Sequence, residues 1–183
     1  MPKGADNMIE IRLIDAAHKE DILLKNDPFP LYGRMVPGYV GGHWDYTIEK
    51  FPPEQCSEMC FPDEPYSYDE MAESADFIGA YQDGICVGLA ILEKSFFKYL
   101  YLSDLKVSAS CRKLGIGKML IEKCMELAKE KKMQGVSLTV QDNNLSACLF
   151  YLKTGFRIGG LDTEVYNGTS QAGKADIAMY RDV

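Results

Sequence analysis

One tight turn joins a strand-like run to a long helical pattern and reads Ser110-Cys111-Arg112-Lys113-Leu114-Gly115-Ile116-Gly117-Lys118. The run before it, residues 99–107, is rich in the aromatic and aliphatic side chains of a strand. Its two glycines let the backbone approach a ligand closely, while the N–H groups of the first helical turn point outward. The helix dipole adds roughly 0.3–1 kcal/mol in favour of an anion, and the loop carries cationic side chains as well. The turn therefore suits a phosphate, although glycines before a helix can also serve only to permit the turn.

Two familiar phosphate-binding motifs do not fit. A Walker loop ends in Gly-Lys-Ser/Thr, but Met119 follows Lys118 here, and a dinucleotide fingerprint needs a third glycine where this chain has Leu120. The residues match Arg/Gln-x-x-Gly-x-Gly/Ala, and in this the turn resembles the acetyl-CoA pyrophosphate loop of the GNAT N-acetyltransferase superfamily. The typical loop has glycine where this chain has Lys113, so backbone freedom is lower and a cation is gained. The resemblance implies that acetyl-CoA is bound by Arg112, Lys113, Leu114, Gly115, Ile116, Gly117 and Lys118.

A second motif follows and reads Asn144-x-x-Ala147-x-x-Phe150-Tyr151-x-Lys153-x-Gly155-Phe156. It resembles the second GNAT motif, at the expected distance after the first. In that family the strand before the glycine loop and the strand at 137–141 splay apart, and the pantetheine arm lies between them. The resemblance implies backbone contacts to the acetyl and pantetheine groups from Leu105, Lys106 and Val107. It also implies that Asn144 contacts the cofactor arm and that Tyr151 stands near its sulfur.

Acetyl transfer from a thioester to an amine needs an oxyanion stabiliser, a proton acceptor for the amine and a proton donor for the leaving thiolate. A backbone N–H near Val107 can stabilise the oxyanion, an effect typically worth a few kcal/mol. With the motif, Tyr151 is the predicted donor; without it, a helix tyrosine packed in the core is the plainer interpretation. For the base we choose Asp104, while Glu93, Asp142 and a water molecule are alternatives, and positioned groups of this kind contribute about 10²–10⁴-fold.

The order of patterns along the chain predicts an α/β fold. It runs βα, β hairpin, β, α, β, α, β, β, which indicates a mixed sheet with helices on its faces. The resemblance implies the GNAT acyl-CoA N-acyltransferase fold, with a central twisted sheet of about six to seven strands and helices on both faces. Asp83-Gly84 predicts a two-residue hairpin turn, and Asp15 is placed to cap a helix that runs through Leu23.

The early part of the chain is less regular. Residues 27–44 hold so many prolines, glycines and aromatics that we expect an ordered binding loop rather than a helix or a linker. The alternation over 44–51 predicts a strand, and 54–73 predicts loops with a short helix. We therefore expect one domain, 1–183, with acceptor-side loops at 26–74 and an acetyl-CoA-binding core at 97–158.

Composition excludes several classes of protein. The hydrophobic content of 46% excludes a disordered chain, and no apolar run approaches the roughly 18 residues of a membrane helix. The net charge of −7 argues against nucleic acid as a partner. The first seven residues contain no apolar segment of a secretory signal, so a cytoplasmic location is expected. The six cysteines lack a Cys-x-x-Cys pair, which favours free thiols over a metal site.

Charge is unevenly distributed between two regions. Residues 49–73 hold eight acids and one base, whereas 111–135 hold seven bases and three acids. This asymmetry suggests one region that faces an anionic cofactor and one that faces a small cationic substrate, although solvated loop charge is the alternative.

A narrower resemblance fits this asymmetry. Five segments look like the streptothricin acetyltransferases, whose substrate carries a polycationic β-lysine chain: Asp27-Pro28-Phe29-Pro30, Gly33-Arg34, Trp44-x-Tyr46-Thr47, Gln141-Asp142-Asn143-Asn144 and Gly155-Phe156-Arg157-Ile158-Gly159. Ser103 departs from that group, where the position is often acidic. The resemblance implies N-acetylation of streptothricin, and hence antibiotic resistance. A protein, peptide or polyamine N-acetyltransferase, or a CoA-binding module without turnover, remains an alternative, and a homodimer is possible for such domains.

Overall fold

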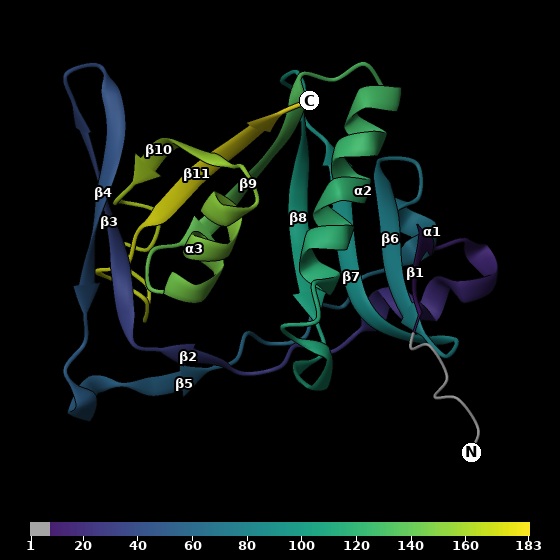
Figure 1. Cartoon of the computed structure of the whole chain (residues 1–183), viewed down its shortest axis with the longest axis horizontal. Helices are drawn as coiled ribbons and strands as arrows, with labels where there is room; N and C mark the ends of the chain where they lie inside the picture. Colours follow the sequence, from purple (N-terminus) through teal and green to yellow (C-terminus); the bar gives the residue numbers. More distant parts are fainter. Residues whose placement is uncertain (1–7) are drawn as a thin grey trace.

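The computed structural model describes residues 8–183, and the prediction that concerns the first seven residues lies outside them. Its centre is a seven-stranded sheet with the order β1-β6-β7-β8-β9-β11-β10 (Figure 1). Neighbouring strands are antiparallel except β8 and β9, which confirms the predicted mixed sheet. The strands are β1 (Ile9–Leu13), β6 (Ala75–Gln82), β7 (Ile85–Lys94), β8 (Tyr99–Val107), β9 (Gly135–Gln141), β10 (Arg157–Asp162) and β11 (Asp176–Asp182).

The sheet opens between its first half, formed by β1, β6, β7 and β8, and its second half, formed by β9, β11 and β10. The parallel pairing of β8 with β9 covers only three residue pairs, from Tyr99↔Gly135 to Tyr101↔Ser137. Beyond Tyr101 the two strands diverge, so that they form the sides of a V in Figure 1. The splay that the resemblance implied for these two strands is therefore present.

Helix α2 (Ile116–Glu130) covers one face of the first half of the sheet (Figure 1). Its apolar residues Ile116, Leu120, Cys124, Leu127 and Ala128 are all buried in the main core. This spacing of three and four residues places them on one stripe of the helix. Helix α3 (Leu145–Lys153) packs between β9 and β3, and its first turn is capped by the side chain of Asn144.

The opposite face of the first half carries shorter elements. A second apolar cluster includes Ile22, Phe77 and Leu89 and lies under η1 (Ala16–Leu23) and α1 (Tyr68–Met71). Asp15 caps η1 as expected, because its carboxylate accepts the N–H of Ala17 at 3.0 Å. The predicted helix is a 3₁₀ helix interrupted at His18, where φ is −119°. The hairpin prediction is confirmed, and both turn residues, Asp83 and Gly84, have the positive φ of that turn type.

The expectation that 27–44 is an ordered loop is wrong in its secondary structure, because the segment contains strands. This segment forms β2 (Phe29–Leu31) and β3 (Gly33–Val40), and β3 pairs along its length with β4 (His43–Lys50). A two-stranded ribbon has free outer edges, so it tolerates prolines and glycines that a central strand excludes. The glycines at 41 and 42 supply the positive φ of its turn. Strand β2 pairs with β5 (Ser57–Met59), which follows the short η2 (Pro53–Gln55), within the predicted loop and short-helix region.

No helix within residues 8–183 is long and apolar enough to cross a membrane.

Candidate active site

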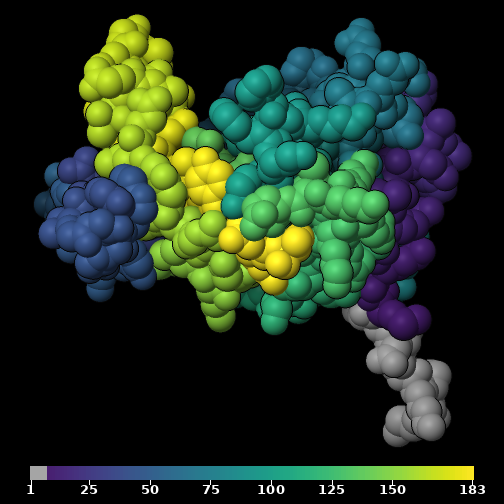
Figure 2. All heavy atoms as spheres, turned by 90° about the horizontal axis from the view of Figure 1, so that it is seen from above, coloured from purple at the N-terminus to yellow at the C-terminus, as the bar shows by residue number. Residues whose placement is uncertain are grey.

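A cleft of about 500 Å³ lies where β8 and β9 diverge. Figure 2 shows the hollowed surface between the yellow-green segment that connects β10 to β11 and the teal strands of the first half. Of the predicted site residues, the cleft brings together Asp104, Leu105, Lys106, Val107, Arg112, Asn144 and Tyr151. It does not include Lys113 to Lys118, which lie beyond its rim in the glycine turn and the first turn of α2.

An irregularity in β8 directs two charged side chains into this cleft. Asp104 pairs with Ile91, but Leu102 pairs with the next residue, Leu92, so Ser103 is an extra residue in the ladder. Without this bulge, strand alternation would turn Asp104 toward α2, the side on which Leu102 is buried. The bulge therefore places Asp104 and Lys106 on the face away from α2.

The backbone after the bulge has one unpaired side. Residues 105–107 pair with β7 alone, because the pairing of β8 with β9 has already ended at Tyr101. Alternate N–H and C=O groups of a strand edge point away from its single partner and are available to a ligand. This arrangement fits the predicted backbone contacts of Leu105, Lys106 and Val107 with a cofactor arm.

The glycine turn has the geometry of an anion site. Gly115 is the N-cap of α2 with φ of 84°. A Cβ added at this position would have no residue within 4 Å other than its two chain neighbours. Lys113, at the position where the typical loop has glycine, also has a positive φ of 65°. The Phe150 ring packs on Gly117, where an added Cβ would lie 3.1 Å from its Cζ, so the turn is held against α3. The exposed loop cations and the first N–H groups of α2 therefore fit a pyrophosphate.

Arg112 binds the chain rather than pointing freely from the loop. Its guanidinium donates to the carbonyl oxygens of Val107 at 3.2 Å, Pro28 at 2.7 Å and Asp27 at 3.2 Å. The carboxylate of Asp27 in turn accepts the N–H of Ala109 at 2.7 Å. The acceptor-side segment before β2 is thereby attached to the turn that precedes α2.

The carboxylate of Asp104 belongs to a buried charge cluster. Lys106 Nζ lies 2.9 Å from Asp104 and 2.8 Å from Glu64, and the Lys106 side chain is only 8% exposed. The Tyr66 hydroxyl donates to Asp104 at 3.2 Å. Burial raises the pKa of Asp104, and the neighbouring Lys106 cation opposes that rise. For Lys106 burial acts against the charged form, but the Glu64 and Asp104 carboxylates outweigh it and raise its pKa.

Tyr151 lies on α3 at the other side of the cleft. Its ring makes edge contacts with Phe150 and Phe156, at centroid distances of 5.3 and 5.6 Å. Burial, followed by the charge of Asp104, raises the pKa of Tyr151 well above its usual range. The phenol therefore stays protonated at neutral pH, which a proton donor requires. Asn144 lines the cleft, and its side-chain oxygen accepts the N–H of Ala147 at 3.2 Å.

The other two base candidates do not line the cleft. Glu93 pairs with Tyr101 further back along β8. Asp142 is buried, and its carboxylate accepts the N–H of Ala175 at 3.2 Å while its carbonyl accepts that of Met35. Asp142 thus connects the end of β9 to its neighbours, and Asp104 is the one of the three carboxylates that reaches the cleft.

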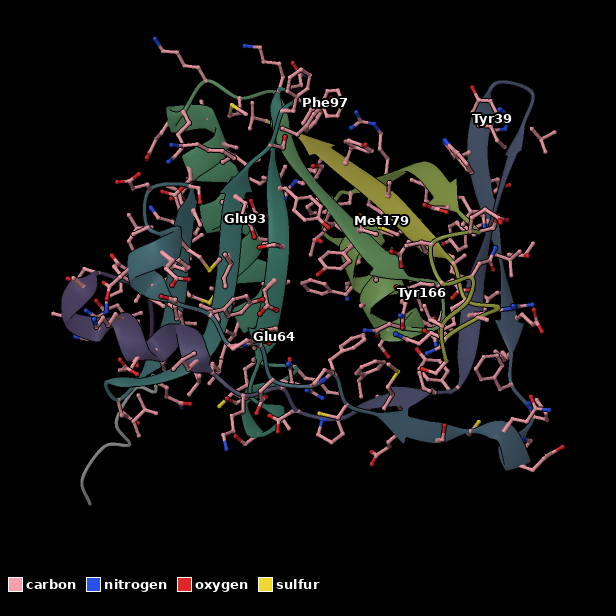
Figure 3. All side chains as sticks on the ribbon, turned by 180° about the vertical axis from the view of Figure 1, so that it is seen from behind. Tyr39, Glu64, Glu93, Phe97, Tyr166 and Met179 are labelled. Atoms are coloured by element: carbon pink, nitrogen blue, oxygen red, sulfur yellow. The ribbon has the colours of Figure 1, made fainter. Side chains whose placement is uncertain are left out.

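Several residues that line the cleft were not among the predicted site residues. Glu64 lay within the acidic region but had no pattern of its own, and Gln141, Tyr166 and Asp176 come from the other half of the sheet. Figure 3 shows Glu64 and Tyr166 on opposite sides of the divergence between β8 and β9. Gln141 could have been predicted as a cleft residue, because it comes shortly before the second motif in the sequence. For Tyr166 and Asp176 the local sequence held no signal, since only the pairing of β11 beside β9 brings them to the cleft.

Comparisons with known proteins agree with this geometry. The model of the Acetyltransferase (GNAT) family matches residues 44–156. The chain is 35% identical to streptothricin acetyltransferase A of Bacillus subtilis (strain 168) over 161 residues, which are 88% of this chain and 92% of that protein. A Bacillus anthracis str. Ames structure in complex with acetyl coenzyme A is 30% identical, with a TM-score of 0.85 over 96% of this chain and 99% of that one.

The crystal structure of nourseothricin acetyltransferase is similar in fold alone, at 24% identity and a TM-score of 0.77 over 95% of this chain and 98% of that one. The fold, the splayed strands and the anion-binding turn all fit acetyl-CoA as the cofactor. The chain therefore belongs to the GNAT family of acetyltransferases and is an enzyme of acetyl-CoA-dependent acetyl transfer.

Proposed function

We propose that this enzyme acetylates a primary amine of a small cationic substrate and that its acceptor is streptothricin. The observation that carries the proposal is the cleft itself, which joins Tyr151 and Asp104 at the strand divergence and is lined by four carboxylates. Acidic walls attract a multiply charged amine by electrostatic focusing. The similarity to streptothricin acetyltransferase A of Bacillus subtilis over most of both chains supports this choice of acceptor.

The cofactor supplies an activated acetyl thioester, and we assign its binding to two parts of the chain. The turn from Arg112 to Lys118 holds the pyrophosphate through backbone N–H groups and the cations of Lys113 and Lys118, while the Arg112 guanidinium attaches the turn to residues 27 and 28. The open edge of β8 at Leu105, Lys106 and Val107 aligns the thioester arm, together with the amide of Asn144. We further propose that residues 97–158 act as the cofactor core and 26–74 as the acceptor side.

Three groups then act on the reacting atoms. A backbone N–H near Val107 donates to the carbonyl oxygen as negative charge develops there, which typically contributes a few kcal/mol. Asp104 accepts the proton that the amine loses, directly or through water, and the Lys106 cation keeps that carboxylate ionised. The Tyr151 hydroxyl gives its proton to the departing thiolate.

The direct test is mass spectrometry after incubation with acetyl-CoA and streptothricin. We expect the drug to gain one acetyl mass, and a sensitive bacterium that expresses this chain should become resistant. An unchanged drug together with acetylated proteins or polyamines would assign the enzyme to those acceptors instead. Binding of acetyl-CoA without transfer to any amine of a broad panel would identify a binding module.

A further inference from the structure

The four carboxylates of the cleft are not equivalent. Glu64 and Asp104 share the Lys106 cation, and Asp27 accepts a backbone N–H at the start of η3 (Ala109–Cys111). Asp176 differs, because its one hydrogen-bond donor is the neutral hydroxyl of Tyr166, at 2.7 Å. Within residues 8–183, no ion pair joins Asp176 to a Lys, Arg or His. The wall formed by β9 and β11 therefore carries a carboxylate that has no direct ion pair among the described residues, and the nearby Lys174 ammonium is hydrogen-bonded to Gln171 instead.

A second unsatisfied acceptor lies beside it. Gln141 is directly opposite Asp176 in the pairing of β9 with β11, so both side chains project from the same face of the sheet. Gln141 is 6% exposed, and its amide nitrogen donates to Gln171 at 2.9 Å. Its side-chain oxygen is buried without any hydrogen-bond donor among the described residues. A buried acceptor left unpaired destabilises the protein, so a ligand that supplies a donor here recovers free energy.

The Tyr166 hydroxyl completes the group. Its proton is used on Asp176, which leaves its oxygen able to accept. The pKa of Tyr166 is raised to about 12, chiefly by burial and then by the hydrogen bond to Asp176. The phenol is therefore neutral and adds no second negative charge. Three acceptors meet on this wall, and an alkylammonium group offers three N–H donors and one positive charge.

We propose that Asp176, Gln141 and Tyr166 bind an ammonium group of the acceptor other than the amine that is acetylated. The amine that is acetylated belongs next to Asp104 on β8, whereas Tyr166 lies across the divergence from Glu64, on the side of β9 and β11 (Figure 3). The enzyme then selects acceptors that carry at least two amino groups. This inference rests on the proposed cationic acceptor and adds the residues that choose it.

Calorimetric titration of streptothricin into the CoA-loaded protein tests the subsite. We expect Asp176→Asn to weaken binding at least tenfold and Tyr166→Phe to weaken it about threefold, because the carboxylate remains in the second variant. Glu164→Gln is the matched control, since Glu164 is an exposed carboxylate of the same β10–β11 connection outside the cleft, and it should bind like the wild type. Thermal unfolding of each variant confirms that it is folded.

The outcomes separate this inference from the proposed function. If Asp176→Asn binds streptothricin within twofold of the wild type, the subsite is wrong even when the drug is acetylated. If binding depends on Asp176 but no acetyl group is transferred, the subsite stands and the proposed reaction fails. If the wild type does not bind the drug at all, both are wrong. In the kinetics of an active enzyme, Asp176→Asn should raise the acceptor KM and leave the acetyl-CoA KM unchanged.

Discussion

The guanidinium of Arg112 donates a hydrogen bond of 2.7 Å to the carbonyl oxygen of Pro28, which lies 84 residues earlier in the chain. This contact and its neighbour at Asp27 connect the turn before α2 to the segment that enters β2. One side chain thus joins the glycine turn to the segment that enters β2, the two regions that we propose for the cofactor and the acceptor.

This connection predicts an unusual phenotype for Arg112→Lys. Lysine keeps the charge but cannot reproduce the planar fork that reaches two carbonyls together. We expect the acceptor KM to rise several-fold and the acetyl-CoA KM to change little in steady-state kinetics. Lys113→Ala is the control, since it removes an exposed loop cation without such contacts and should mainly raise the acetyl-CoA KM. The reverse result would assign the Arg112 guanidinium to the pyrophosphate.

Replacement of Tyr151 by phenylalanine isolates the proton donor. The ring keeps its packing on Phe150 and Phe156, so acetyl-CoA affinity should stay nearly intact. We expect kcat to fall well over tenfold, because the thiolate then leaves without a positioned acid. Tyr99→Phe removes a hydroxyl that binds Asp182 outside the cleft and should leave kcat unchanged. Wild-type turnover in Tyr151→Phe would assign Tyr151 to packing alone.

The charge cluster predicts a shift in the pH profile. Burial raises the pKa of Asp104 and Lys106 lowers it, so removal of that cation in Lys106→Met moves the pKa further up. A base acts only when deprotonated, and the acidic limb of kcat/KM should therefore move to higher pH. Lys106→Arg retains the charge and should keep a limb near that of the wild type. Identical limbs in Lys106→Met and the wild type would exclude Asp104 as the base.

The backbone of the turn before α2 predicts that substitutions at positions 113 and 115 change stability differently. Gly115→Ala forces a Cβ into the left-handed region at φ of 84°, which costs about 1–2 kcal/mol in the free energy of unfolding. Lys113→Gly removes the same kind of strain at φ of 65° and thereby stabilises the folded state. Glycine also gives the unfolded chain more freedom, which lowers the free energy of unfolding by about 0.4–1 kcal/mol. Denaturant unfolding should show a clear loss for the first variant and a small change for the second. Equal losses would mean that φ does not govern this turn.

Much of the first half of the fold follows from local patterns. The hairpin at Asp83-Gly84, the buried stripe of α2 and the Asn144 cap depend on residues close together in sequence, and all three are present. Strand β4 agrees with the strand predicted over 44–51. Its partner β3 was missed because the prolines and glycines of its segment argue against a strand, while an unpartnered ribbon edge accepts them.

The glycine motif and the aromatic motif by themselves indicated the family and the cofactor, because backbone geometry at a phosphate-binding turn demands particular residues at fixed spacing. Only the tertiary structure decided that Lys106 neutralises Asp104 and Glu64, that Arg112 holds Pro28, and that Asp176 and Tyr166 face the cleft. The contacts of Lys106 with Glu64, of Arg112 with Pro28 and of Asp176 with Tyr166 join residues 10 to 84 positions apart, whereas Lys106 and Asp104 lie on the same strand. Burial and long-range contacts decide which of these charges are neutralised, and no local sequence pattern encodes such contacts.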